Sequence, residues 1–246
     1  MDVTTRSFTE AVRALGVAQK SNRGAPLYSR LVNRPLGRIL AAAAHQVGLS
    51  PNQVTGVSAC FTFTGIALVA MVPPSPAMAA VIAVLLVIGY GLDSADGQLA
   101  RLLGRGSPAG EWLDHVCDSL KTATIHLAVV VSLYRFADLP TDLLLVVPLA
   151  YSALDTTLFF AFILTERLRK PSGPRLATAD SSRPSVLRAM LSAPTDYGIL
   201  CLVFFTLAWP HVFLVAYGVM LLGTAGYALL ALPKWYRDVS RLREGA

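Results

Sequence analysis

Six long apolar segments divide this sequence, and they constrain its fold more than any other feature. Each holds about 20 residues or more, which is enough for a helix to cross a bilayer core of about 30 Å. Loops rich in proline and glycine separate the segments, because these residues end helices. The segments cover residues 52–72, 76–101, 111–135, 142–165, 187–209 and 211–233. Because 54% of the residues are hydrophobic and only 15% are charged, we predict an all-α polytopic membrane protein.

Four aspartates lie in the second and third segments, where a charged side chain is energetically unfavourable. Asp93 and Asp96 belong to the second segment, and Asp114 and Asp118 to the third. A spacing of three or four residues places each pair on one face of its helix. Ionisable residues within membrane spans indicate a functional site. Four converging carboxylates also repel one another unless cations are bound, and such oxygen ligands suit Mg²⁺ or Mn²⁺. We therefore predict a divalent-metal site.

The aspartates belong to a longer pattern with fixed spacing. It reads D-x-x-D-G-x-x-A-R and, after eight further residues, G-x-x-x-D-x-x-x-D; its members are Asp93, Asp96, Gly97, Ala100, Arg101, Gly110, Asp114 and Asp118. This pattern resembles the signature of the CDP-alcohol phosphotransferase family. These integral membrane enzymes move a phosphatidyl-type group from a CDP-linked donor to an alcohol. The stretch P-N-Q-V-T at residues 51–55 resembles the start of the family's first membrane helix.

The resemblance implies a role for each position of the pattern. Asp93, Asp96 and Asp114 are expected to hold two divalent ions, and Asp118 to accept the proton of the acceptor hydroxyl and to serve as a further candidate ligand. The expected nucleotide contacts are Thr55, Asp96, Gly97, Ala100, Arg101 and Gly110. Helix packing is the alternative role for the small residues, and anchoring at the membrane surface is the alternative for Arg101. The expected reaction transfers a phosphatidyl group from CDP-diacylglycerol to a polar alcohol and releases CMP, as in phospholipid biosynthesis.

Three further ionisable residues are candidates for the acceptor pocket, namely Lys121, Asp155 and Asp196. Lys121 lies one turn beyond Asp118 and is expected to act as a counter-charge for the aspartates. Asp155 and Asp196 lie in hydrophobic segments, which favours function, although a structural polar pair is the alternative. Residues 194–198 are expected to break the fifth segment and to line the pocket. His115 is expected to point to another face of its helix and to pack there.

The identity of the acceptor alcohol is less constrained than the donor chemistry. Family members that use inositol phosphate carry basic residues near the cytoplasmic ends of their later spans. The corresponding stretch here, 159–164, is apolar, and the chain has Ala193 to Asp196 where such members have an arginine-rich start to the next helix. Phosphatidylinositol-phosphate synthase is therefore the alternative assignment. Glycerol phosphate, serine and other polyols remain open as acceptors.

Lysine and arginine residues indicate how the chain is oriented in its membrane. They gather before the first segment, between the second and third, between the fourth and fifth, and after the sixth; the opposite loops hold little besides Arg135. By the positive-inside rule, both termini and the aspartates are cytoplasmic. Basic and apolar residues alternate over 27–48, which predicts an amphipathic interfacial helix.

The expected organisation is a cytoplasmic segment over 1–50, a six-span catalytic domain over 51–235 and a cytoplasmic tail over 236–246. We expect a prokaryotic plasma-membrane protein that forms a homodimer and does not bind nucleic acid. A cation transporter or channel with an acidic ion path is the alternative from another class. That alternative explains the carboxylates but leaves Gly97, Ala100, Arg101 and Gly110 without a role.

Overall fold

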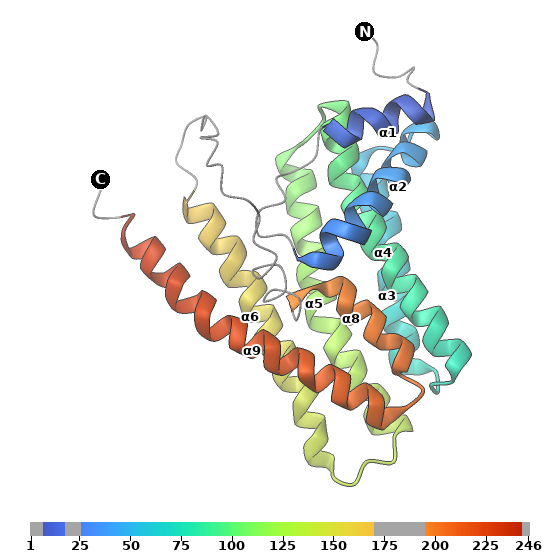
Figure 1. Ribbon diagram of the computed structural model, residues 1–246, viewed down its shortest axis with the longest axis vertical. Coiled ribbons are helices and arrows are strands. Elements are labelled where there is room, and N and C mark those ends of the chain that lie inside the picture. The colour runs from blue at the N-terminus through green and yellow to red at the C-terminus, as the bar shows by residue number, and fades with distance from the viewer. Residues whose placement is uncertain (1–6, 18–25, 170–194, 243–246) are drawn as a thin grey trace.

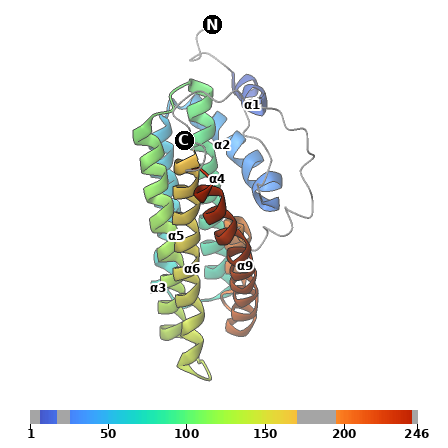
Figure 2. The same cartoon turned by 90° about the vertical axis from the view of Figure 1, so that its left-hand side faces the viewer.

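The computed structural model describes residues 7–17, 26–169 and 195–242. Within these ranges the chain forms helices and no strand. The long helices are α3 (Pro51–Met71), α4 (Pro76–Leu103), α5 (Pro108–Phe136), α6 (Val146–Arg169) and α9 (Pro210–Ser240). Helices α3 to α6 run side by side, and α9 crosses them obliquely (Figures 1 and 2). Five helices are long and apolar enough to cross a membrane, which confirms the all-α polytopic class.

Serine followed by proline begins three of the long helices. Ser50, Ser75 and Ser107 each cap the helix that starts at the next residue, and their hydroxyl oxygens accept a hydrogen bond from Gln53 N, Met78 N and Gly110 N respectively. Proline suits the first helical position because its missing N–H would have no partner there. At the other end of α4, Gly104 adopts a left-handed conformation with φ of 63°, which glycine tolerates without a steric penalty. The short α4–α5 loop therefore places the ends of both helices together.

The fifth predicted segment, 187–209, does not form one long helix over the residues that the structure describes. Residues 187–194 of this segment lie outside the described residues. The described part forms α8 (Tyr197–Val203), and a 3₁₀ turn, Phe204–Thr206, follows it directly. Helix α8 begins where residues 194–198 were expected to interrupt the segment. The cause is Asp196, whose Oδ1 accepts a hydrogen bond from Gly198 N at 3.1 Å and caps the helix. The apolar helix Tyr197–Thr206 is shorter than the other spans.

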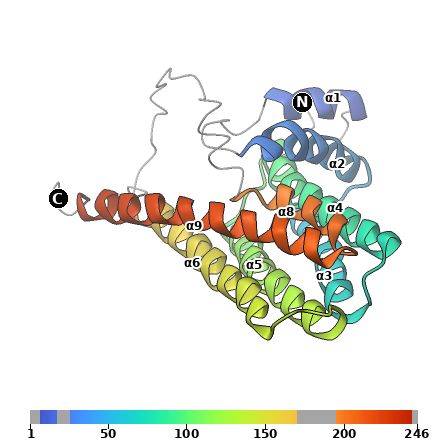
Figure 3. The ribbon, with the colours of Figure 1, turned by 60° about the horizontal axis from the view of Figure 1, so that its bottom comes forward.

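Helix α9 extends past the predicted end of the sixth segment. It continues through Pro233 to Ser240, although an internal proline removes one backbone hydrogen bond. Contacts with α6 support the added turns, because Arg169 pairs with Asp238 and the rings of Phe162 and Trp235 lie 6.0 Å apart. Figure 3 shows α9 running on beyond the rest of the bundle.

The predicted interfacial helix is present over residues 27–46, made of a short π-helical stretch, Ser29–Asn33, and α2 (Arg34–Gln46). It packs on α4 through Gly37, where an added Cβ would lie 2.7 Å from the Ser94 hydroxyl oxygen. Leu31 and Ile39 are 63% and 51% exposed, as an interfacial helix requires. Helix α1 (Phe8–Val17) covers the same end of the bundle, near the α4–α5 loop (Figure 1).

The start of this interfacial helix is fixed to α8. Ser29 N donates a hydrogen bond to Asp196 Oδ2 at 3.2 Å, and the Tyr28 ring lies against Gly198. Burial raises the pKa of the Tyr28 phenol, so Tyr28 stays neutral beside Asp196. Asp196 thus holds both the α8 start and the N-terminal segment, which is a structural role that the sequence left open.

Gly198→Ala is expected to destabilise the protein, because its Cβ would lie 2.0 Å from Tyr28 Cδ1. Overpacking of this kind typically lowers the free energy of unfolding by about 1–3 kcal/mol. Thermal unfolding in detergent measures the change. Gly218→Ala on α9 is the matched control, since its Cβ would meet nothing within 4 Å. Equal melting temperatures for the two variants would show that Tyr28 does not pack on Gly198.

Candidate active site

The four signature aspartates meet where the end of α4 lies beside the start of α5. Asp93 interacts electrostatically with Asp96, Asp114 and Asp118, and Asp96 also interacts with Asp114 and Asp118. Asp96 is buried, with 6% of its surface exposed. The group lies toward the end of the bundle that carries α1, α2 and the α4–α5 loop (Figure 1). The helices therefore bring together the carboxylates that their spacing predicted would converge.

A cavity of about 680 Å³ lies on one side of the aspartates, and we call it the first cavity. It lies between the starts of α3 and α5 and the end of α4. Each of the six residues predicted to contact a nucleotide lines it, together with Asp114, His115 and the α4–α5 loop; the predicted six are Thr55, Asp96, Gly97, Ala100, Arg101 and Gly110. Its volume falls in the range of small-molecule sites, about 300–1,000 Å³.

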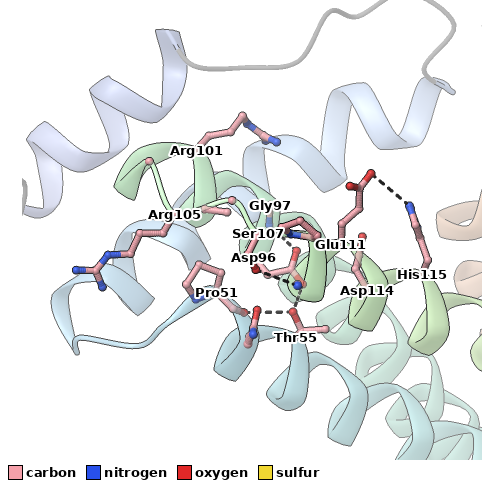
Figure 4. Close-up of a pocket in the computed structure, with 16 residues that line it drawn as sticks. Pro51, Thr55, Asp96, Gly97, Arg101, Arg105, Ser107, Glu111, Asp114 and His115 are labelled. Carbon is pink, nitrogen blue, oxygen red and sulfur yellow. Dashed lines mark hydrogen bonds and ion pairs between the residues drawn. The ribbon is translucent and has the colours of Figure 1, made fainter. Parts of the chain in front are cut away.

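Asp96 is held in place by hydrogen bonds from two elements. Thr55 Oγ1 on α3 donates to Asp96 Oδ2 at 2.6 Å, and Gly97 N donates to Asp96 Oδ1 (Figure 4). Thr55 Oγ1 also lies 3.2 Å from the Pro51 carbonyl oxygen. The Thr55 hydroxyl thus orients a carboxylate, in addition to lining the first cavity. Such a fixed carboxylate needs little reorganisation when it binds a ligand.

The two signature glycines have different surroundings. A Cβ at position 97 would meet only the Arg101 side chain, at 3.6 Å, which is ordinary contact. Helix packing therefore does not require glycine there, and the missing side chain leaves space in the first cavity. At position 110 a Cβ would lie 2.9 Å from Asn52 Oδ1 and 3.2 Å from the Ser107 hydroxyl oxygen. Gly110 therefore both lines the cavity and allows the starts of α3 and α5 to approach.

A second cavity, of about 350 Å³, lies on the other side of the aspartate group. Asp93 and Asp118 line it, and so do Lys121, Asp155 and Asp196, the three residues predicted for an acceptor pocket. Lys121 is buried and pairs with Asp118 and with Asp93, the latter at 3.6 Å between Nζ and Oδ1. Its ammonium also lies 4.9 Å from the centre of the Tyr197 ring. Lys121 has the position of the predicted counter-charge.

A buried polar group beside the second cavity was not predicted from the sequence. His126, which is fully buried, lies with Nδ1 against the Tyr217 hydroxyl and with Nε2 at 3.3 Å from Asp155 Oδ2. The Tyr151 ring stacks on the imidazole at 4.1 Å between centroids. The only sequence signal was the presence of ionisable residues in the third and fourth apolar segments, because their pairing depends on how α5, α6 and α9 pack.

His115 lies in a different place from the one expected. Instead of packing on a face away from the site, it lines the first cavity. Three possible metal-ligand atoms lie within 4.8 Å of one another, one each from Asp114, His115 and Asp118. His115 Nε2 is also 3.9 Å from Glu111 Oε1 (Figure 4). The signal for this placement was the four-residue spacing between Glu111 and His115, which puts both on the helix face that lines the first cavity.

These residues fit a divalent metal. They supply several carboxylate oxygens and an imidazole nitrogen within a small volume, and hard oxygen ligands suit Mg²⁺ and Mn²⁺. Lys121 pairs with Asp93 and Asp118, and Arg101 interacts electrostatically with Asp96. A bound cation would reduce the remaining repulsion among Asp93, Asp96, Asp114 and Asp118.

The fold and the carboxylate group define a polytopic membrane enzyme with a metal site at one end of its helices. The family model for CDP-alcohol phosphatidyltransferases matches residues 49–230, well over half of the chain, so the protein belongs to this family. It is therefore an integral membrane phosphatidyltransferase of a divalent-metal-dependent, phospholipid-synthesising family. Family membership decides against the cation transporter.

Two solved structures share the fold, and both are of phosphatidylinositol phosphate synthase from Mycobacterium tuberculosis. The one with CDP-diacylglycerol bound has 18% identity and a TM-score of 0.55 over 83% of this chain and 94% of that chain. The one in complex with manganese and citrate has 20% identity and a TM-score of 0.55 over 80% and 87%. Identities this low show a common fold alone. No curated protein matches the sequence.

Proposed function

We propose that this enzyme transfers the phosphatidyl group of CDP-diacylglycerol to a polar alcohol and releases CMP. The observation that carries the proposal is the position of the aspartates between two cavities that share no lining residue. Asp96 and Asp114 line the first, and Asp93 and Asp118 line the second. A displacement at phosphorus needs its leaving and attacking oxygens roughly in line. One cavity for the nucleotide and another for the alcohol meet this need.

The first cavity suits the CDP moiety of the donor. Arg101 and Arg105 line it beside Gly97 and Gly110, which provides positive charge for a diphosphate and space near the backbone. A protein of the same fold has been solved with CDP-diacylglycerol bound. We assign Thr55, Asp96, Gly97, Ala100, Arg101 and Gly110 to this nucleotide site.

Each aspartate has a proposed task in the transfer. Asp93, Asp96 and Asp114 would hold two divalent ions, and Asp118 acts chiefly as the base. When bound, these ions offset the charge of the diphosphate and stabilise the departing phosphate of CMP. Asp118 accepts the proton of the alcohol as the new phosphorus–oxygen bond forms and the anhydride bond to CMP breaks. The ion pair with Lys121 orients the Asp118 carboxylate for this step.

The test is CMP release by the purified protein, supplied with CDP-diacylglycerol, a panel of alcohols and Mg²⁺ or Mn²⁺. Metal-dependent, acceptor-dependent CMP release with formation of the matching phospholipid is the expected result. Chelator should stop it, and added metal should restore it. Turnover of a soluble CDP-alcohol, with CDP-diacylglycerol inert, would reject the proposed donor.

The proposed orientation places the aspartates and both termini in the cytoplasm, because the sequence concentrates Lys and Arg in the segments that flank the site-bearing helix ends, such as the α4–α5 loop with Arg105 and the end of α6 with Arg167. A cysteine at Ser75, in the α3–α4 loop at the opposite end, is expected to react with an impermeant reagent in intact cells. A cysteine at Ser172, which lies outside the described residues, should react only after permeabilisation. The native cysteines are first replaced, and the reverse labelling would contradict the orientation. The prokaryotic plasma membrane, the homodimer and the division at residues 50 and 235 stay predictions.

A further inference from the structure

We infer that the acceptor alcohol carries a positive charge, as an amino alcohol does, and that Asp155 in the second cavity binds its ammonium group. This inference rests on the proposed function, because it names the substrate class of the proposed acceptor site. The inference predicts that amino alcohols such as ethanolamine and choline are acceptors, and that phosphorylated polyols such as glycerol phosphate and inositol phosphate are not.

The first support is the charge of the second cavity. Four carboxylates line it, from Asp93, Asp118, Asp155 and Asp196, whereas Lys121 is the one basic side chain of its described lining. The Lys121 ammonium is already paired with Asp93 and Asp118. Where bound ions offset Asp93 and Asp118, the carboxylates of Asp155 and Asp196 still line this cavity and repel a phosphate group. An ammonium group would be attracted to these carboxylates.

Two basic residues at the end of α6, Arg167 and Arg169, also have acidic partners. Arg167 Nη2 lies 2.8 Å from Glu111 Oε1. Arg169 pairs with Asp238 and lies 3.7 Å from Glu166 Oε1. These ion pairs tie α6 to α5 and α9, so recruiting either arginine to a phosphate would break a contact between helices.

Asp155 provides a carboxylate in the second cavity. Its side chain is 29% exposed, whereas its neighbour His126 is fully buried. An ionised Asp155 can only accept a hydrogen bond, so His126 Nε2–H donates to Asp155 Oδ2, while His126 Nδ1 lies against the Tyr217 hydroxyl. The exposed part of the Asp155 carboxylate lines the second cavity. Asp118 lines the same cavity from α5, and in the inferred binding mode the hydroxyl of the amino alcohol lies at Asp118 and its ammonium at Asp155.

The aromatic lining of the second cavity favours an ammonium group as well. The rings of Tyr197 and Tyr90 already lie 4.9 and 5.9 Å from the Lys121 ammonium, so the walls of this cavity stabilise a buried ammonium. Trp235 lines the same cavity, with its ring 6.0 Å from that of Phe162 and 6.4 Å from that of Tyr227. Aromatic faces attract alkylammonium ions and give phosphates no comparable interaction.

The decisive experiment compares ethanolamine and choline with glycerol 3-phosphate and inositol 1-phosphate as acceptors for the wild type and Asp155→Asn. The wild type should release CMP with the ammonium alcohols. Asparagine can still accept the hydrogen bond from His126 but lacks the charge. Asp155→Asn should therefore raise the KM for these alcohols by about 10- to 100-fold, the range of one charged hydrogen bond, with the KM for CDP-diacylglycerol unchanged. Glu166→Gln, also on α6 but outside the cavity, is the control.

Calorimetric titration of the same alcohols, without the donor, separates this inference from the proposed function. Asp155-dependent binding of ethanolamine or choline supports the inference even if CDP-diacylglycerol proves not to be the donor. Preference of the wild type for a phosphorylated polyol overturns it while the proposed function stands. An unchanged affinity for ammonium alcohols in Asp155→Asn, or no binding of them by the wild type, overturns it too.

Discussion

Asp93→Asn and Asp114→Asn are expected to lose metal binding and CMP release together. Asparagine keeps the volume of the side chain but removes a negative charge from a group of four carboxylates that interact with one another. Changes to residues that merely support metal ligands typically lower affinity or activity by 10–100-fold, so loss of a ligand should reduce turnover by more than about 100-fold. Mn²⁺ binding, followed by electron paramagnetic resonance, and CMP release measure the two effects.

Asp142→Asn is the control for these variants, since Asp142 is exposed in the 3₁₀ turn before α6, at the opposite end of the bundle. It makes the same chemical change and should alter neither quantity. Thermal unfolding checks that each variant is folded. If either site variant keeps wild-type turnover at saturating metal, that residue is not a required ligand, and the assignment of Asp93 or Asp114 fails.

The sequence predicted the first cavity better than any other part of the site. Its lining comes from two short stretches, 51–55 and 96–115, the second of which includes the short α4–α5 loop. The helix starts were also readable, because Ser50, Ser75 and Ser107 each precede a proline and cap a helix. Local rules of capping and helical spacing determine these features, so they need no knowledge of how distant helices pack.

The second cavity depends on packing between segments far apart in the sequence. Asp118, Asp155 and Trp235 line it from α5, α6 and α9, and no spacing rule relates their positions. The same holds for His126, whose partners Asp155 and Tyr217 come from two other helices. The sequence marked Asp155 and Asp196 as unusual, yet only the structure shows that Asp155 faces a cavity with Asp118 and that Asp196 caps α8.

Asp118→Asn is expected to keep both donor and metal binding and to lose transfer. Asp118 lines the second cavity with Lys121, whereas Asp96 and Asp114 line the first, so the donor site would stay intact. An amide cannot accept the proton of the alcohol. Loss of such a base typically lowers the rate by about 10²–10⁴-fold. Lys121 would retain Asp93 as a partner, which should preserve folding.

The measurement that separates a base from a ligand is donor affinity beside turnover, in Asp118→Asn and in Asp93→Asn. A base variant should bind CDP-diacylglycerol and Mn²⁺ like the wild type while turnover is lost, whereas a ligand variant should lose all three. The two variants are well matched, because both aspartates pair with Lys121 and each substitution removes one partner of the same ammonium. Equal loss of donor and metal binding in the two variants would make Asp118 a metal ligand first, and the proton would then need another acceptor in the second cavity.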